Sequence, residues 1–192
     1  MLTLKNLSLS ACIAIGTLIG ATSAQAGDDD KLYGEPLPAD AAFVRALGGA
    51  AGAEVEAFGV TLSADGNYTV VLADTTEGIE TGQYVTVLPK ANVTHVAQDD
   101  LGKVQIMFLN AGYEGDLSLK TADGKVAIAE AASNSAGFRE VNPIVVPVAV
   151  FAGSDVLGQS FELKLRRAEN PTIFVTKDGE ISQIVSKVIW GD

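Results

Sequence analysis

The chain has 192 residues, and its 24 Asp and Glu against 13 Lys and Arg give a formal net charge of −11 at pH 7. This charge argues against nucleic acid or an anionic membrane surface as the main partner, because both require a cationic face. It also weighs against tight binding of a polyanionic polysaccharide, unless the few basic residues cluster.

Residues 1–26 have the layout of a secretory signal peptide. Lys5 supplies the positive n-region, an uncharged apolar run follows over 11–21, and small residues stand at Ala24 and Ala26, the −3 and −1 positions of a cleavage site. The run is shorter than the roughly 20 residues that span a bilayer, and no later segment is long enough. We therefore expect cleavage after Ala26, export from the cytosol and no membrane span in the processed chain.

A second interpretation of this segment is a lipoprotein signal, since residues 9–12 match a lipoprotein box. The apolar stretch, however, follows Cys12 where it should precede it. Cleavage after Ala26 removes Cys12, the only cysteine, and Lys5, which makes the net charge −12. The remaining chain has no disulfide and no thiolate, so it must rely on hydrophobic burial. Its roughly 166 residues suffice for one domain or for two smaller ones.

The start of the processed chain is polar and extended. Residues 27–31 carry the acidic run 28–30, for which we expect a solvated tail, with a calcium site as the alternative. Pro36 and Pro38 follow and predict an extended, non-helical segment.

From residue 41 onward, short apolar runs separated by turn residues predict strands. Helix is the competing prediction for 41–56, but its three interior glycines each cost a helix about 1 kcal/mol relative to alanine. The expected strands are 41–47, 54–62, 67–72, 83–88, 92–97, 103–110, 116–120, 125–129, 139–141, 144–151, 160–166, 172–176 and 181–190.

Turn residues add detail to this pattern. The pairs Asp65-Gly66, Asp123-Gly124 and Asp178-Gly179 predict hairpin turns. Pro147 lies inside an otherwise strong strand, which predicts that this strand is at a sheet edge or bulged.

A faint internal repeat suggests the domain organisation. Residues 44–48 and 54–56 match residues 106–110 and 116–118, and each copy continues to an Ala-Asp-Gly turn. With the strand number and turn spacing, the repeat favours an all-β fold of two tandem β-sandwich domains joined by a short linker. We expect the first domain over 27–99 and the second over 103–192.

The sequence contains few residues in patterns typical of catalysis. His95 is the only histidine, and a lone strand histidine is more often a surface or hydrogen-bonded side chain than a catalytic base. Residues 115–118 resemble the nucleophile block of Ser-Gly-Asn-His esterases, but Ser118 is displaced and no Asp-x-x-His follows. We find no nucleophile elbow, phosphate-binding loop or metal-ligand spacing, and we predict no catalytic, cofactor-binding or metal-binding residues. A two-carboxylate glycosidase mechanism stays open, since it needs only two acids.

One stretch departs from the overall acidity. Lys164, Arg166 and Arg167, with Arg139 elsewhere, would form a cationic strip if they shared an outer face. An ordinary solvated face is one interpretation. A contact site for an acidic polymer or an acidic partner surface is the other.

Four short segments occur in an order that is typical of a known family. They are residues 32–34, 42–45, 119–125 and 139–143. Together they resemble the AlgF family of periplasmic alginate O-acetylation proteins. The likeness spans nearly the whole processed chain, is strongest over 121–151 and is weak over 49–97.

The resemblance implies a two-domain β-sandwich protein that is not an enzyme and takes no cofactor. Its implied partners are a membrane-bound acyltransferase and Ser-Gly-Asn-His-type periplasmic proteins, which place acetyl groups on O-2 and O-3 of mannuronate in alginate. We therefore carry three hypotheses: a non-catalytic adaptor for these partners, a carbohydrate-binding module that holds alginate, and an acetyl-transferring or esterase enzyme. The adaptor ranks first and the enzyme last.

Overall fold

The computed structural model of the chain describes residues 36–49, 53–97, 100, 102–167 and 169–189. The expected leader with Cys12, the acidic run 28–30 and the lipoprotein box lie outside these ranges. Within them, regular structure consists of strands, which confirms the all-β prediction. No helix in this part of the chain is long and apolar enough to cross a membrane.

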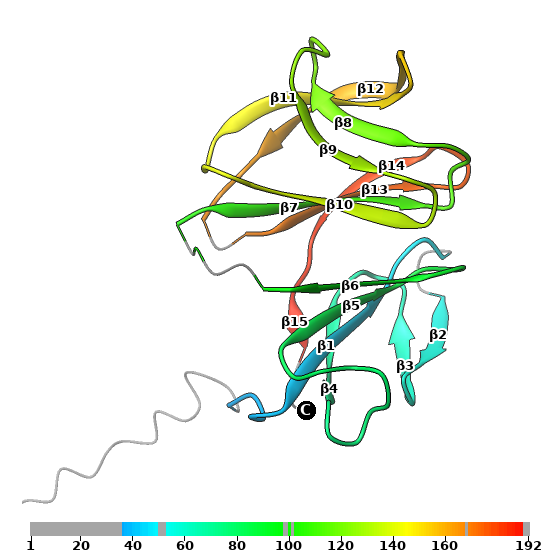
Figure 1. The fold of residues 1–192 in the computed structure, drawn as a ribbon, viewed down its shortest axis with the longest axis vertical. Coiled ribbons are helices and arrows are strands. Elements are labelled where there is room, and N and C mark those ends of the chain that lie inside the picture. The colour runs from blue at the N-terminus through cyan, green and yellow to red at the C-terminus, as the bar shows by residue number, and fades with distance from the viewer. Residues whose placement is uncertain (1–35, 50–52, 98–99, 101, 168, 190–192) are drawn as a thin grey trace, which may run out of the picture. The chain divides into compact units, whose positions relative to one another are not determined.

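The strands follow one another along the chain with short connections (Figure 1). They are β1 (Ala41–Ala46), β2 (Glu54–Ala57), β3 (Val60–Ser63), β4 (Tyr68–Leu72), β5 (Gln83–Val87), β6 (Asn92–Val96), β7 (Val104–Ala111), β8 (Leu117–Thr121), β9 (Ala127–Ala131), β10 (Ser135–Val141), β11 (Val145–Ala152), β12 (Asp155–Lys164), β13 (Pro171–Thr176), β14 (Ile181–Val185) and β15 (Val188–Ile189).

These strands form three larger sheets and a two-stranded ribbon. Sheet A has the order β15-β4-β1-β5-β6, sheet C has β10-β7-β13-β14, sheet D has β12-β11-β8-β9, and the ribbon is β2-β3. The two copies of the internal repeat begin on β1 and β7. Each of these strands has one antiparallel and one parallel neighbour, so the repeat corresponds to a shared local topology.

β1 is buried on both faces because five of its six residues are apolar. Ala42, Val44 and Ala46 pack in a core with Leu62 of the ribbon. Successive side chains of a strand point to opposite faces, so residues 41, 43 and 45 lie on the other face of sheet A. That second face therefore carries a buried arginine among apolar residues.

Sheets C and D share a larger apolar core. Val104, Ile106 and Phe108 of β7 contribute to it from sheet C, and Leu119 and Val150 contribute from sheet D. The alternate residues of β7 face away from this core.

Those alternate residues form a second cluster with sheet A. Met107 and Leu109 of β7 pack with Leu47 and Leu88, which follow β1 and β5. β15, near the C-terminal end, also pairs parallel with β4. The domain boundary expected between residues 99 and 103 stays a prediction. β15, which follows that boundary in the sequence, nevertheless belongs to sheet A.

Two predicted strands are wrong because each is interrupted. Residues 54–62 form two antiparallel strands, since Phe58 and Gly59 have φ of 53° and 74° and make a tight turn. Residues 181–190 hold β14, which pairs in sheet C, and β15, which pairs in sheet A. Apolar periodicity alone does not reveal either break.

The Asp-Gly prediction is confirmed at two of three places. Asp123-Gly124 joins the antiparallel strands β8 and β9, and Asp178-Gly179 joins β13 and β14. Asp65-Gly66 is not a hairpin turn, because it joins β3 to β4, and these strands belong to the ribbon and to sheet A.

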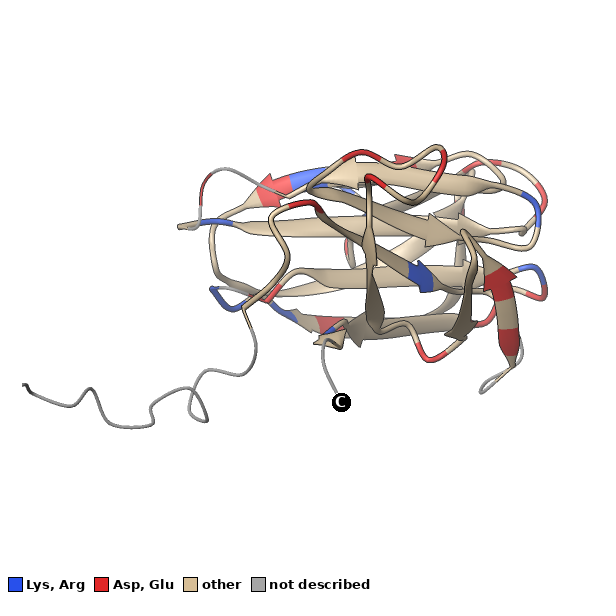
Figure 2. Ribbon diagram, turned by 90° about the horizontal axis from the view of Figure 1, so that it is seen from below, with Lys and Arg blue, Asp and Glu red and all other residues tan. Residues whose placement is uncertain are grey.

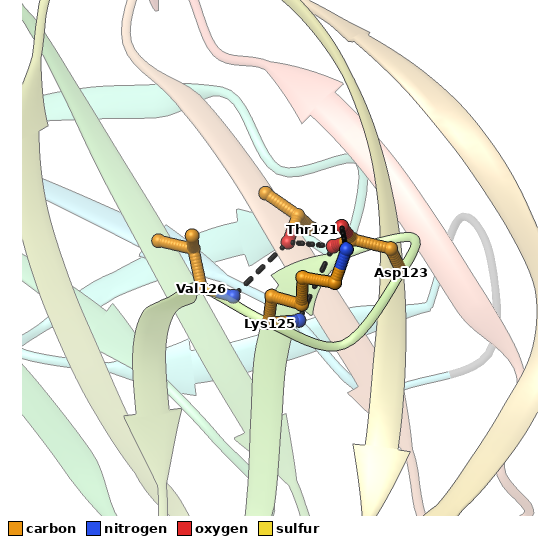
Figure 3. A network of polar contacts seen from close by, with 4 residues as sticks. All are labelled: Thr121, Asp123, Lys125 and Val126. Atoms are coloured by element: carbon orange, nitrogen blue, oxygen red, sulfur yellow. Dashed lines mark hydrogen bonds and ion pairs between the residues drawn. The ribbon is translucent and has the colours of Figure 1, made fainter.

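The Asp123 turn is held by a local polar network (Figure 3). Thr121 Oγ1 donates to Asp123 Oδ1 at 2.6 Å, and the Lys125 backbone N–H donates to the same oxygen at 3.2 Å. The Val126 backbone N–H donates to Thr121 Oγ1 at 3.1 Å. The hydrogen bond from Thr121, followed by that from the Lys125 backbone, lowers the pKa of Asp123. The backbone N–H groups of Lys125 and Val126 therefore find their acceptors within the turn itself, before β9 begins.

Pro147 lies in a bulged strand but not at an edge. β11 is an interior strand between β12 and β8, and its register with β12 shifts between Val148 and Val150. The bulge half of the prediction is confirmed and the edge half is wrong. The Pro147 carbonyl accepts a hydrogen bond from the Ala122 backbone N–H at 2.9 Å.

Candidate functional site

A cavity of about 170 Å³ is lined by side chains from both sheet A and sheet C. Its lining includes Arg45, Tyr68, Tyr84 and His95 from sheet A, and Met107 and Thr172 from sheet C. Val185 and Val188, which also line it, are 46% and 42% exposed, so the cavity is open to solvent on that side.

Strand register brings the sheet A residues together. β1 and β5 place Phe43 beside Tyr84 and Arg45 beside Thr86, and β5 and β6 place Tyr84 beside His95. These pairs share one face because each strand alternates its side chains.

Arg45 is the central charged group of this face. Its side chain is 1% exposed. Its Nε donates to Thr86 Oγ1 at 2.9 Å, and one Nη donates to Thr172 Oγ1 at 2.9 Å. Arg45 also donates hydrogen bonds to Ser186 Oγ and Met107 Sδ, so it links strands β1, β5, β7 and β13.

All four of these acceptors are neutral. No ion pair involves Arg45 within the described ranges. Tyr68 offers the face of its ring, 4.6 Å from the guanidinium carbon, which is a cation–π contact. Burial lowers the pKa of Arg45, partly opposed by Tyr68, and yet guanidinium stays protonated in proteins. The cavity wall thus holds a buried positive charge whose counter-charge is not in the described part of the protein.

Aromatic rings surround this charge. The Tyr84 ring stacks on Phe43 at 4.4 Å and meets Tyr68 edge-on at 5.1 Å between centroids. Burial raises the pKa of Tyr68 and of Tyr84, so both hydroxyls stay protonated near neutral pH. They are potential hydrogen-bond donors rather than competing anions.

His95 completes the aromatic group but has little proton affinity. Its ring lies 5.4 Å from that of Tyr84 and 5.1 Å from that of Phe138. Burial, and secondarily the charge of Arg45, lowers the pKa of His95 to about 4. Its Nδ1 is buried and has no hydrogen-bond partner. His95 is therefore a neutral, partly unsatisfied side chain, and the prediction that it is a surface or hydrogen-bonded histidine is wrong at this atom.

This shift makes the stability of the protein depend on pH. Folding lowers the pKa of His95 from 6.5 to about 4, so between these values the unfolded state binds more protons. The free energy of unfolding should fall as the pH drops below about 6.5, and the share due to His95 should amount to roughly 3 kcal/mol once the pH is below about 4.

Substituting His95→Gln should remove that share. Urea unfolding of the parent and the variant near pH 7 and near pH 4 measures it, and the difference in unfolding free energy between the two proteins should change in favour of the variant at low pH. The other titratable groups are the same in both proteins, so their contributions to the unfolding free energy cancel in this difference. A difference that is the same at both pH values would contradict the expected shift.

The predicted cationic residues are only partly brought together. Arg139 lies on β10 of sheet C, while Lys164 ends β12 of sheet D and is followed by Arg166 and Arg167. Lys164 Nζ lies 3.4 Å from Glu162 Oε1, and Arg166 Nη1 lies 3.9 Å from Glu169 Oε1. Both cations therefore have exposed acidic neighbours. Figure 2 shows short basic segments set apart from one another, several of them beside acidic ones.

The two candidate esterase residues belong to different sheets. Ser118 is on β8 of sheet D, and His95 is on β6 of sheet A. Among the described residues, no group of His, Cys, Asp and Glu is arranged to hold a metal ion.

Sequence reasoning missed Arg45, Tyr68 and Tyr84 as a group. One indication was present: Arg45 interrupts an otherwise apolar run at 41–47 and so had to be buried once that run became a central strand. The sequence around Tyr68 and Tyr84 has no comparable feature that predicts their burial beside Arg45.

Together, these features define an all-β protein with mixed sheets and a cavity that contains a buried cation. No family model matches the chain. It is 26% identical over 202 residues to the alginate biosynthesis protein AlgF of Pseudomonas putida, covering 93% of each protein, and 29% identical over 192 residues to AlgF of Pseudomonas aeruginosa, covering 89% of this chain and 88% of that one. The chain belongs to the AlgF family.

Among solved structures, the C-terminal domain of AlgF from Pseudomonas aeruginosa is similar to this chain. The two are 32% identical, the match covers 43% of this chain and 94% of that domain, and the TM-score is 0.38.

Proposed function

We propose that this protein is an accessory factor in alginate biosynthesis that supports O-acetylation of the polymer in the periplasm without itself transferring acetyl groups. The observation that carries the proposal is the similarity over about nine-tenths of the chain to relatives named alginate biosynthesis protein AlgF. In this account the chain is exported after cleavage at Ala26 and folds as two tandem β-sandwich domains.

The geometry of the candidate catalytic groups favours an accessory role. A serine nucleophile needs a histidine within hydrogen-bond reach that can accept its proton. The His95 ring stacks on that of Tyr84 and contacts that of Phe138 at a tilt, and Ser118 belongs to another sheet. A pKa of about 4 also makes His95 a poor general base.

The proposed partners are a membrane-bound acyltransferase and Ser-Gly-Asn-His-type periplasmic proteins, which acetylate O-2 and O-3 of mannuronate. A strand from a partner cannot add beside Pro147, since β11 is an interior strand of sheet D. The edges of sheet D are β12 and β9, and β10 lies against the backbone of β9 at Glu130, so an added strand from a partner would pair along β12.

Co-purification tests this proposal. Tagged protein, expressed with the acyltransferase and the periplasmic acetylation components and purified from detergent extracts, should retain at least one of them. A matched strain that carries the tag on an unrelated exported protein controls for non-specific capture. Recovery no greater than in this control would contradict the adaptor role.

The second candidate function is a carbohydrate-binding module. Its support is the group Lys164, Arg166 and Arg167 with Arg139, which would attract a polyuronate despite the net acidity of the chain. Exposed ion pairs such as that of Arg166 with Glu169 are weak, so a polymer would compete with them readily.

Neutralising Arg166 and Arg167 separates the two functions. We expect the double variant Arg166→Gln with Arg167→Gln to change the free energy of unfolding by no more than about 0.5 kcal/mol, because both side chains are exposed. Under the adaptor account it should also retain its partners, as measured by the same co-purification. Salt-sensitive alginate binding by the parent that disappears in the variant would favour the module instead.

A further inference from the structure

The cavity at Arg45 contains a charge that the described residues do not balance. Burial of an ion is costly unless an opposite charge or several hydrogen bonds compensate it. Arg45 is 1% exposed, and its hydrogen bonds go to three hydroxyls and one thioether. A buried guanidinium with only neutral partners in the wall of an open cavity is the arrangement expected of an anion site.

The remaining groups favour an anion that accepts hydrogen bonds. Guanidinium has five N–H donors, and four hydrogen bonds from Arg45 are accounted for. Tyr68 and Tyr84 stay protonated and line the same cavity, as does His95 with its unpartnered Nδ1. Each of them can supply a donor without adding positive charge.

Size and charge narrow the class of anion. The cavity holds about 170 Å³, room for a small organic group with one ionic end. Arg45 is the only fully charged cation in the lining, which suits a single negative charge, whereas phosphate sites usually gather several cations or backbone donors. The apolar walls of Met107, Val185 and Val188 suit a ligand with a carbon skeleton.

We propose that this cavity binds one carboxylate group, with Arg45 as its charged partner and Tyr68 and Tyr84 as further donors. The carboxylate belongs either to free acetate or to a uronate residue of the polymer. The choice between these two sources rests on the proposed function, whereas the carboxylate site itself does not.

The single histidine offers a direct test. The imidazole resonances of His95 report on the cavity without assignment ambiguity, since the chain has no other histidine. The purified protein is titrated with acetate, with the methyl glycoside of mannuronate and with inorganic phosphate. Saturable shifts with a carboxylate are the expected result, and the tighter of the two carboxylates identifies the source. No saturable shift with either, or phosphate binding as tightly as the better carboxylate, would overturn the proposal.

A second readout comes from the charge of Arg45. A bound carboxylate offsets this charge, so saturation should raise the pKa of His95 above its value of about 4. Arg45→Met should bind at least tenfold more weakly, because it loses a charge-assisted hydrogen bond. Lys90→Gln, which removes one exposed positive charge outside the cavity, is the matched control and should bind like the parent.

These results are independent of the co-purification outcome. Carboxylate binding without partner recovery would contradict the accessory function alone. Partner recovery without carboxylate binding would contradict the cavity proposal alone.

Discussion

Replacing Arg45 with methionine should yield a protein that still folds but has lost its carboxylate site. Methionine has a similar length and needs no counter-charge, and apolar replacement of buried ionic groups is often neutral or stabilising. The substitution also removes four hydrogen bonds, which is destabilising because the hydroxyls of Thr86, Thr172 and Ser186 lose a partner. We expect a change in unfolding free energy within about 2 kcal/mol in either direction.

The same variant should change the pKa of His95. The charge of Arg45 is the second cause of its low value, after burial, so Arg45→Met should raise the pKa while leaving it below 6.5. Urea unfolding measures the stability, and imidazole chemical shifts against pH measure the pKa. Retained acetate binding with an unchanged pKa of His95 would mean that Arg45 does not control the cavity.

Substituting Gly137→Ala should cause the largest loss of stability. A Cβ on Gly137 would lie 2.1 Å from the carbonyl oxygen of Glu130 and 3.0 Å from its nitrogen. These are backbone atoms of β9, which pairs with β8 in sheet D, whereas Gly137 is on β10 of sheet C. Relief of the contact requires the two strands to separate, and we expect a cost of about 3 kcal/mol or more.

Gly49→Ala is the matched control for this substitution. Gly49 lacks a positive φ, and the nearest atom to its added Cβ is the Ala64 Cβ at 3.6 Å, an ordinary contact distance. Its unfolding free energy should stay within about 0.5 kcal/mol of the parent. Equal losses for the two variants in urea unfolding would show that the approach of β9 and β10 does not limit stability.

Local pattern predicted most of the strands because most of them have one clear apolar face. Phe161, Leu163 and Leu165 alternate along their strand, and Leu163 and Leu165 are buried in the core of sheets C and D as expected. The turns at Asp123-Gly124 and Asp178-Gly179 were predictable because these pairs suit a left-handed residue between paired strands.

The errors arise where tertiary pairing decides between local alternatives. Phe58 adopts a positive φ that a bulky residue rarely takes, so no turn was predicted within 54–62. Asp65-Gly66 has turn chemistry, but its flanking strands pair with β2 and β1 instead of with each other. Pro147 lies in an interior strand whose register with β12 shifts between Val148 and Val150, and this pairing is not visible in the local sequence.

The candidate site could not be predicted from the sequence for a similar reason. Arg45 meets Thr86, 41 residues away, through the pairing of β1 with β5, and it meets Thr172, 127 residues away, because sheet A and sheet C pack face to face at this point. Local patterns carry no information on which faces of two sheets meet. The cationic group at Lys164, Arg166 and Arg167 was visible in the sequence because those residues are nearly adjacent.

The acetyl content of alginate from a strain that lacks this gene tests the central claim most directly. An accessory role in O-acetylation predicts polymer of ordinary amount with strongly reduced acetylation, restored by the parent gene on a plasmid. Complementation with a gene that encodes Lys90→Gln should restore it equally. Fully acetylated polymer from the deletion strain would contradict the account.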